Sequence, residues 1–470
     1  MGSPCLKPRA IPAQASEHQY RDRSSTRQVE RYSQQTTVRE DRAVENNLEN
    51  HFQHFAGIDW GSAQHRVCLI DRQGKVIQQR WFEHSGSGLA ELAAWLPRRA
   101  NQPPQSLAVA IEVPHGAIVE TLLERGFPVF SINPRQLDRF RDRFSPAGAK
   151  DDSRDAQVLA DSLRTDMHCF HPVRLDEPAM IRLRELSRLE DQIGEEFRRA
   201  ANRLREQWHR FFPQLLQLVG AADEPWLWTL FEMAPDPASA ARLTPAKIQR
   251  ILTQHRIRRV QPAQILATLK TPPLCLAPGA AEAAAEHALL LLPHLRLLHQ
   301  QRTHIARRVQ TLLDEMAAHT GSQPDTAPDT QPQEHRDAAI LLSLPGLGRK
   351  VAATMLSEAA QAIAERDYHA LRSYSGAAPI TQQSGKKKIV LMRRACNQRL
   401  RNALYYWAQK STLNDPTSHN HYAQLRARGK SHGCALRIMA GRWLKILIAM
   451  LKSCTLFDKN QRASPALQAA

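Results

Sequence analysis

The sequence contains no long apolar run and no pattern of paired cysteines. Its longest apolar stretches, residues 288–292 and 446–451, are far shorter than the roughly 20 residues of a membrane-spanning helix, and residues 1–54 hold no apolar core typical of a signal peptide. The seven cysteines are scattered and include no CxxC pair, which excludes a disulfide framework and a zinc signature. We therefore expect a cytoplasmic protein without a membrane partner.

Acidic residues are scarce in the last part of the chain. Residues 341–470 contain 21 Lys and Arg against 5 Asp and Glu, and this segment supplies nearly all of the formal charge of +18. A strongly basic region suits a polyanionic partner such as nucleic acid. The length of 470 residues and the apolar content of 42% predict two or three globular domains.

The composition changes several times along the chain. Residues 1–54 are polar, with 8 basic and 7 acidic side chains, and we expect a disordered leader with at most a short helix near residues 44–51. Helical spacing of apolar residues predicts two long, charged helices at 176–213 and 281–319, with small helices between them. The predicted domains are a catalytic domain at 55–170, a helical coiled-coil spacer at 171–319, a linker at 320–336, a mainly α-helical domain at 337–455 and a tail at 456–470.

Residues 55–170 show an α/β pattern. Three strand patterns (FAGID, RVCLID and KVIQQRWFE) are followed by a helix, the strand LAVAIE, a helix, a strand at 127–132 and a helix beginning at Asn133-Pro134. This is the element order of the RNase H and RuvC-like fold, in which an antiparallel hairpin unit is joined by crossovers to parallel strands. The first and fourth strands are neighbours in that fold.

Four acids occupy the places where this fold brings carboxylates together. Asp59 ends the first strand, Glu112 ends the fourth, and Asp152 and Asp155 lie three residues apart at the start of a helix, so both can face the same way. Such clusters hold two divalent cations in phosphoryl transfer on nucleic acids, and Mg²⁺ prefers oxygen ligands. Each acid alone is more often a turn, loop or helix-cap residue than a metal ligand, whereas all four together favour a metal site.

The basic C-terminal region carries a second set of signals. The sequence LPGLGRK before a helix indicates a helix-hairpin-helix motif, which offers backbone amides to a phosphate beside Arg349 and Lys350. Residues 381–388 read as a glycine- and lysine-bearing irregular loop. Tyr405, Tyr406 and Trp407 are interleaved with charge and can stack on bases, although helical spacing places at least one of them in the core. The further predicted nucleic-acid contacts are Lys386, Lys387, Lys388, Arg393, Arg394, Arg399 and Arg401. Near the acids, Arg135, Arg139, Arg141 and Arg143 are predicted contacts of the same kind.

Seven motifs together resemble the Asp-Glu-Asp-Asp transposases of bacterial insertion sequences, which are described as bridge-RNA-guided recombinases. They are GIDWGSAQH, AIEVPHG, NPRQLDRFR, AKDDSRDAQVLA, LPGLGRKVAATML, SGAAPITQQSGKKK and RLRNALYYWA, and they span about residues 55–451. The resemblance implies a RuvC-like domain, a coiled-coil spacer and a C-terminal transposase domain with a catalytic serine. Carried over by position, the metal-binding tetrad is Asp59, Glu112, Asp152 and Asp155, and the serine is Ser384.

The same resemblance sets the expected cofactors and partners. It implies Mg²⁺, two ions per active site with Mn²⁺ as a substitute, double-stranded target and donor DNA, a structured guide RNA, and a homodimer or homotetramer in the bacterial nucleoid. Ser384 would attack the scissile phosphate and form a phosphoserine link.

Two departures from the family pattern leave alternatives open. Asp151 stands where the family commonly has threonine, so Asp151 with Asp155 is a second possible pairing. Cys396-Asn397 replaces a Gly-Asn pair, which puts a tight turn in doubt. A RuvC-like nuclease that uses water as nucleophile and an inactive nucleic-acid-binding protein are the alternative functions, and in both of them the lysine loop around Ser384 does no chemistry.

Overall fold

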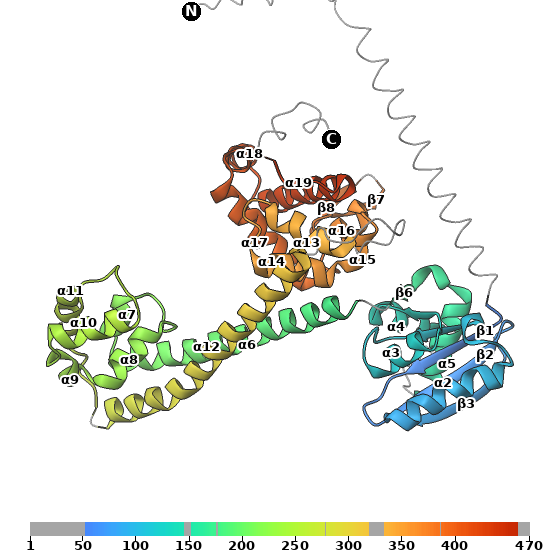
Figure 1. The fold of residues 1–470 in the computed structure, drawn as a ribbon, viewed down its shortest axis with the longest axis horizontal. Coiled ribbons are helices and arrows are strands. Elements are labelled where there is room, and N and C mark those ends of the chain that lie inside the picture. Colours follow the sequence, from blue (N-terminus) through green and yellow to red (C-terminus); the bar gives the residue numbers. More distant parts are fainter. Residues whose placement is uncertain are drawn as a thin grey trace, which may run out of the picture. The chain divides into compact units, whose positions relative to one another are not determined.

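A computed structural model describes residues 52–144, 152–174, 177–277, 279–318, 333–385 and 387–458; for residues 134, 135, 144, 152, 153 and 333–336 it describes the backbone alone. The chain divides into two compact units at residues 176 and 177 (Figure 1). The predicted leader (1–54) lies outside these ranges except for its last three residues, as do Asp151, Lys386, most of the predicted linker and the end of the tail.

Unit 1 is built on one mixed six-stranded sheet with the order β3-β2-β1-β4-β5-β6 (Figure 1). β1 pairs antiparallel with β2 and parallel with β4, and β4 pairs parallel with β5. The predicted neighbourhood of the first and fourth strands is therefore confirmed. The strands are β1 His54–Asp59, β2 Gln64–Asp71, β3 Val76–Glu83, β4 Leu107–Ile111, β5 Val129–Ser131 and β6 His171–Val173.

Strand β6 was not predicted, and it extends unit 1 beyond residue 170. It has only three residues, includes Pro172, and pairs antiparallel with β5 at the edge of the sheet. Proline cannot donate a hydrogen bond to a ladder and is tolerated in edge strands. Periodicity is not readable in so short a segment.

Helices cover both faces of this sheet. Alternation along β1 sends Ile58 to one face, where α2 (Gly86–Ala100) and α3 (Ala117–Glu124) pack. It sends Phe55 to the other face, where α4 (Pro134–Phe144) and α5 (Asp152–Thr165) pack. The three-layer arrangement confirms the predicted α/β class and is compatible with an RNase H-like domain.

Unit 2 begins with the two long helices predicted from periodicity. α6 (Pro178–Phe211) and α12 (Ala280–Ala318) lie side by side within one chain and share one apolar core (Figure 1). Pairing of these helices between two chains stays a prediction. The small helices between them are α7 Gln214–Leu218, α8 Pro225–Met233, α9 Pro237–Ala241, α10 Pro245–Gln254 and α11 Pro262–Leu269. All but α7 begin with proline at the first helical turn, where a missing N–H costs no hydrogen bond.

The rest of unit 2 is mainly helical, as predicted. Its helices are α13 Gln333–Ser343, α14 Arg349–Glu358, α15 Ala360–Ala364, α16 Tyr368–Tyr374, α17 Gln398–Asn414, α18 Pro416–Ala427 and α19 His432–Ser453. Trp407 is fully buried beside Trp443, whereas Tyr405 and Tyr406 are exposed. The expectation that at least one of the aromatic triplet belongs to the core is confirmed.

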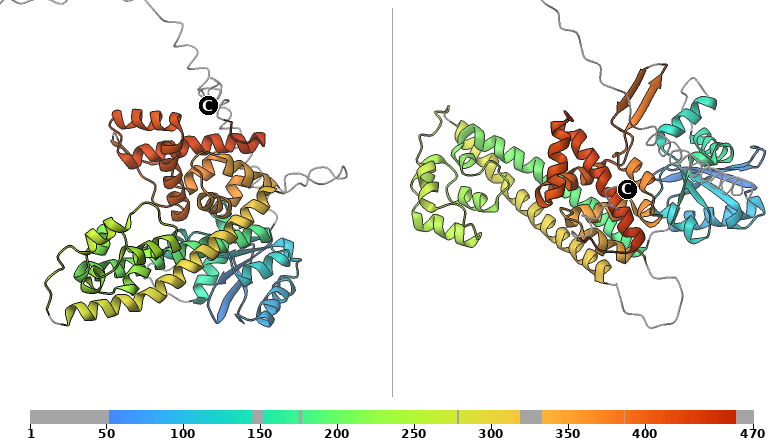
Figure 2. Two further views of the ribbon diagram at one scale, coloured as in Figure 1. Left: turned by 60° about the vertical axis from the view of Figure 1, so that its left-hand side comes forward. Right: turned by 90° about the horizontal axis from the view of Figure 1, so that it is seen from above.

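The prediction of an irregular loop at residues 381–388 was wrong. This segment forms a two-stranded antiparallel hairpin, β7 (Ile380–Ser384) and β8 (Lys387–Leu391), that projects from the helices (Figure 2). β-branched residues on both sides of a turn favour strands, and Gly385 adopts a positive φ of 54° in that turn. The prediction failed because every residue of both strands is exposed, so no alternation of buried and exposed positions marks them.

Within the described part of the chain, no helix is both long enough and apolar enough to cross a bilayer.

Candidate active site

Two predicted carboxylates leave the sheet at the same edge. β1 and β4 are parallel, and Ile58 pairs with Ile111. Asp59 follows Ile58, and Glu112 follows Ile111, so the two acids lie next to each other along the sheet edge. The carboxyl ends of parallel neighbours mark the usual binding edge of an α/β sheet. The structure therefore brings together the strand ends that carry Asp59 and Glu112.

Helix α5 places a third carboxylate beside this edge. A Cβ atom on Gly57 would lie 2.0 Å from the carbonyl oxygen of Ala156, so the helix backbone lies directly against β1. Asp155 precedes Ala156 and is only 4% exposed. Asp152 begins the same helix one turn earlier, but only its backbone is described, and the alternative ligand Asp151 lies outside the described residues.

One arginine of α4 links these acids. The Arg141 guanidinium donates to both oxygens of Asp155, with Nε–Oδ1 and Nη2–Oδ2 distances of 2.9 and 3.2 Å. Its Nη2 is 3.7 Å from Oε2 of Glu112, and its Nη1 donates to Asp138 at 2.7 Å. Burial opposes the charge of Arg141, but Asp155, Asp138 and Glu112 outweigh it and raise the pKa of the guanidinium. Arg141 was expected to contact nucleic acid, and here it is a counter-ion of the carboxylates.

The oxygen donors around Arg141 fit the chemistry of a divalent cation. The described side chains include no group of three or more His, Cys, Asp or Glu close enough to share one metal ion. A positive charge nevertheless already lies among the acids, because the Arg141 guanidinium bridges Glu112 and Asp155. Carboxylate oxygens are the ligands that Mg²⁺ prefers. The donor set is therefore suitable for a metal, with Arg141 as a competing cation.

A histidine pair supports the segment that follows Asp59. His65 is fully buried, its Nε2 lies 2.9 Å from Nδ1 of His84, and the backbone N–H of Gly61 donates to its Nδ1 at 3.4 Å. Burial, with His84 as a second cause, lowers the pKa of His65 to about 4. A neutral ring can accept the Gly61 hydrogen bond at physiological pH. Sequence reasoning gave this histidine no role, although it ends the motif GIDWGSAQH.

Ser384 lies in unit 2, at the turn of the β7–β8 hairpin. It ends β7 and pairs with Lys387, so its backbone belongs to a strand ladder while its side chain is exposed. Lys387 and Lys388 are exposed at the start of β8. An exposed serine hydroxyl at a hairpin tip beside two cations is accessible to a phosphate group.

Comparison with known proteins identifies the family. A transposase model for the Asp-Glu-Asp-Asp proteins of IS110 matches residues 56–213, and the model for the transposase IS116/IS110/IS902 family matches residues 338–423. The mini-circle putative transposase for IS117 of Streptomyces coelicolor is 30% identical over 424 residues, which cover 88% of this chain and 98% of that protein. This chain belongs to the IS110 family of transposases. It is therefore an enzyme that cuts and rejoins DNA, and transposases of this class generally depend on divalent metal ions.

Two further relatives of this transposase agree with that assignment. The putative transposase y4uE of Sinorhizobium fredii is 43% identical over 285 residues, covering 60% of this chain and 74% of the relative. The IS900 uncharacterized 42 kDa protein of Mycobacterium paratuberculosis is 26% identical over 411 residues, covering 85% of this chain and 95% of the relative. The similarity thus extends through both units.

Several cationic side chains predicted to contact nucleic acid form ion pairs within the transposase itself. Arg349 pairs with Glu190 at 3.0 Å and Lys350 with Asp191 at 2.6 Å, both on α6. Arg399 pairs with Asp191 at 2.8 Å and also with Glu358. These three side chains fasten α14 and α17 to α6, so their charge is partly neutralised before any ligand binds.

Glu358 is the centre of that network. Burial opposes its ionisation, but hydrogen bonds from Arg188 and Asn397 at 2.9 Å, together with Arg399, lower its pKa to about 2. Asn397 also caps α17 through Leu400, so Cys396-Asn397 gives a cap where the family pattern suggested a glycine turn.

The other predicted contacts of the transposase differ in how accessible they are. Arg394, Lys387 and Lys388 are exposed, Arg401 is half-buried, and Arg393 donates to the carbonyl of Ala378 at 3.4 Å. Gly346, Gly348, Lys350 and Tyr406 line a shallow hollow at the turn between α13 and α14. Phosphate binding at this turn stays a prediction.

Proposed function

We propose that this transposase is an RNA-guided DNA recombinase in which Ser384 attacks the scissile phosphate. Asp59, Glu112, Asp152 and Asp155 would hold Mg²⁺. The observation that supports the proposal is that Asp59 and Glu112 end neighbouring parallel strands, while the Arg141 guanidinium links Glu112 to Asp155. Bound Mg²⁺ would stabilise charge on the phosphate.

The chain's own residues would divide the reaction between the units. The carboxylates of unit 1 would hold the cations, and Ser384 would supply the oxygen that forms the new bond to phosphorus. The P–O bond to one part of the DNA strand breaks in the same step, and that part leaves as an alcohol, with the proton lost by the serine balancing the one gained by the leaving oxygen. A serine hydroxyl is a poor nucleophile until its proton is removed, so the serine must act next to the carboxylate site. Lys386, Lys387 and Lys388 would neutralise the phosphate. We infer a homodimer or homotetramer in which one subunit's acids meet another's serine.

A structured guide RNA would select the target and donor DNA by base pairing. The support is the concentration of positive charge in residues 341–470 and the family resemblance, since phosphate contacts give affinity but little sequence choice. The protein would then recognise mainly RNA shape and backbone.

Ser384→Ala is expected to abolish a covalent protein-DNA adduct. The wild-type protein, incubated with its RNA, labelled target DNA and Mg²⁺, should give a band that is shifted in denaturing electrophoresis and sensitive to protease. Thr381→Ala is the matched control, because Thr381 is an exposed hydroxyl residue on the same strand. Cleavage that survives Ser384→Ala without any adduct would instead support a nuclease that uses water. Absence of metal-dependent cleavage in the wild type would support a binding protein.

Arg141→Gln is expected to destabilise the metal-free protein and to tighten Mn²⁺ binding. Asp155 is almost fully buried, and removing the partner of a buried ion costs about 3 kcal/mol. A charged hydrogen bond is worth about 1.5 to 3 kcal/mol, so removal of the competing cation should raise Mn²⁺ affinity about tenfold or more. Thermal unfolding in EDTA and Mn²⁺ titration by electron paramagnetic resonance measure the two effects.

Arg143→Gln is the control for this variant. Arg143 lies two residues further along α4 and pairs with Asp166 at 3.1 Å, outside the carboxylate group. Equal Mn²⁺ affinity in wild type and Arg141→Gln would show that Arg141 does not compete for the metal site.

A further inference from the structure

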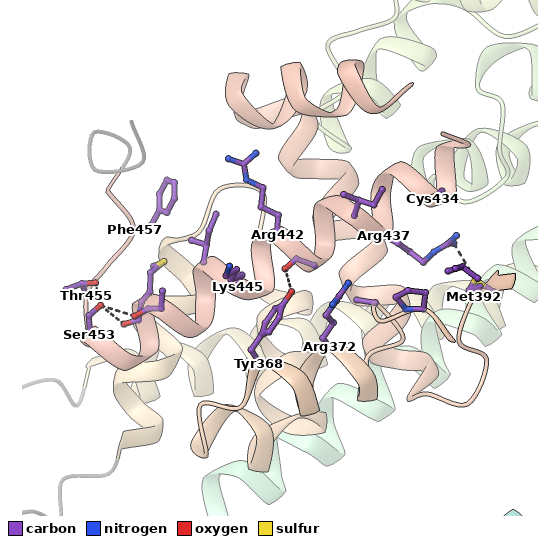
Figure 3. A pocket seen from close by; sticks show the side chains of 18 of the residues that line it. Tyr368, Arg372, Met392, Cys434, Arg437, Arg442, Lys445, Ser453, Thr455 and Phe457 are labelled. Atoms are coloured by element: carbon purple, nitrogen blue, oxygen red, sulfur yellow. Dashed lines mark hydrogen bonds between the residues drawn. The ribbon is translucent and has the colours of Figure 1, made fainter. Parts of the chain in front are cut away.

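Unit 2 has a groove that none of the roles above uses. It encloses about 780 Å³ between α16, β8, α19 and the residues after α19 (Figure 3). Its apolar surface is unusually accessible, since Val390 is 62% exposed and Leu456 60% exposed. Leu391, Ile438 and Ala449 continue this apolar floor. A contiguous exposed apolar surface of this kind marks a binding site.

Positive side chains surround the apolar floor. The lining includes Arg372, Arg437, Arg442 and Lys445 (Figure 3), and the one acid among its described residues is Asp458. The Arg372 guanidinium carbon lies 5.8 Å from the ring centre of Tyr368, and among the described residues its buried Nε has no hydrogen-bond partner. Arg437 donates to the sulfur of Met392 at 3.4 Å, which is a weak acceptor. The Arg437 guanidinium therefore retains hydrogen-bonding capacity for a ligand, whereas Arg372 contributes positive charge, because its buried Nε faces the protein.

We propose that this groove binds an unpaired DNA strand, with bases on the apolar floor and phosphates on the four cations. Base faces and phosphates together match an apolar groove with a basic rim. Single strands bind by charge and by stacking of bases on aromatic side chains, and Tyr368 and Phe457 are the aromatic residues in this lining. A duplex would engage the cations but leave the floor uncovered. The chain's own residues 459–470 are a poor occupant, because they add Lys459 and Arg462 and contain no acid.

The chemistry of the family supplies this ligand. An enzyme that cuts and rejoins DNA exposes unpaired nucleotides when strands are exchanged. β8 forms part of the groove wall and follows directly on the hairpin turn, and Leu391 lies four residues, or about 13 Å, beyond Lys387. A strand in the groove would thus lie along the hairpin that carries Ser384. Binding itself does not depend on the identity of the nucleophile.

The test compares two ligands by fluorescence anisotropy, using the full-length protein without Mg²⁺. One is a labelled oligothymidylate, and the other is an abasic phosphodiester chain of the same length. We expect the wild type to prefer the oligothymidylate by about tenfold, the size of one or two stacked bases. Ala449→Trp fills the groove from an exposed position of α19 and should reduce oligothymidylate affinity to that of the abasic chain. Lys445→Gln should lower the affinity of the protein for both ligands.

Ala423→Trp, at an exposed position of α18 outside the groove, is the matched control and should bind as wild type does. Equal wild-type affinity for the two ligands, or a preference that survives Ala449→Trp, would overturn the proposal. Oligouridylate binding at least tenfold tighter than oligothymidylate would also overturn it, in favour of an RNA site. A changed oligomeric state in Ala449→Trp with the base preference intact would assign the groove to a second copy of the chain. None of these binding measurements requires DNA cleavage, so the proposal for the groove can fail while the proposed serine mechanism holds.

Discussion

Asp59→Asn is expected to lower the rate of DNA strand cleavage about 1,000-fold while changing DNA affinity by less than about threefold. The substitution preserves the shape of the side chain but removes one negative charge from the edge at which β1 and β4 end. A metal-binding carboxylate acts on the charged transition state, whereas DNA affinity comes mainly from phosphate contacts with the many cations elsewhere. Cleavage with Mg²⁺ is measured by denaturing electrophoresis and affinity by fluorescence anisotropy.

Asp71→Asn serves as the control for Asp59→Asn. Asp71 is also the last residue of a strand, but it accepts hydrogen bonds from the backbone N–H groups of Gln73 and Lys75 at 2.9 Å in the β2–β3 turn. It pairs with His54, at the end of β1 remote from Asp59. Its substitution should leave cleavage nearly unchanged. Loss of thermal stability in Asp59→Asn, or cleavage within tenfold of wild type, would show that Asp59 is a structural residue.

The order of unit 1 could be predicted because local patterns determine it. Apolar strands, turns and helical spacing gave the sequence of elements. That sequence matches the RNase H and RuvC-like fold, in which the first and fourth strands are neighbours. That step placed Asp59 beside Glu112 without any knowledge of side-chain contacts. The position of α5 could be predicted only in part, because residues 145–151 connect it to α4 and carry no periodic pattern.

The partners of the charged residues could not be read from the sequence. Arg141 lies 14 residues from Asp155 and 29 from Glu112, and nothing local distinguishes it from Arg139 or Arg143. Likewise, Arg349 and Lys350 looked like phosphate ligands because their acidic partners on α6 are about 160 residues away. Long-range ion pairs depend on tertiary packing, so a basic segment alone overstates the charge available to nucleic acid. The groove beside β8 was missed because its walls come from four segments.

Gly57→Ala is expected to destabilise unit 1 by about 3 kcal/mol, at the upper end of the cost of overpacking. Its Cβ would lie 2.0 Å from the carbonyl oxygen of Ala156 and 2.5 Å from the backbone nitrogen of Ala160. Both contacts are with backbone, so no side chain can move aside, and α5 would have to shift away from β1. Asp155 would shift with it, so cleavage should fall along with stability.

Thermal unfolding and limited proteolysis of the full chain measure this loss for Gly57→Ala. Gly86→Ala is the matched control, since a Cβ there meets nothing within 4 Å and Gly86 begins helix α2, where alanine is favourable. A melting temperature equal to that of the wild type would mean that α5 does not lie against β1 in solution. The carboxylate site would then lose the contact that brings Asp155 next to the edge carrying Asp59 and Glu112. A lower melting temperature in Gly57→Ala alone would instead show that one residue without a side chain sets the distance between the helix acids and the strand acids.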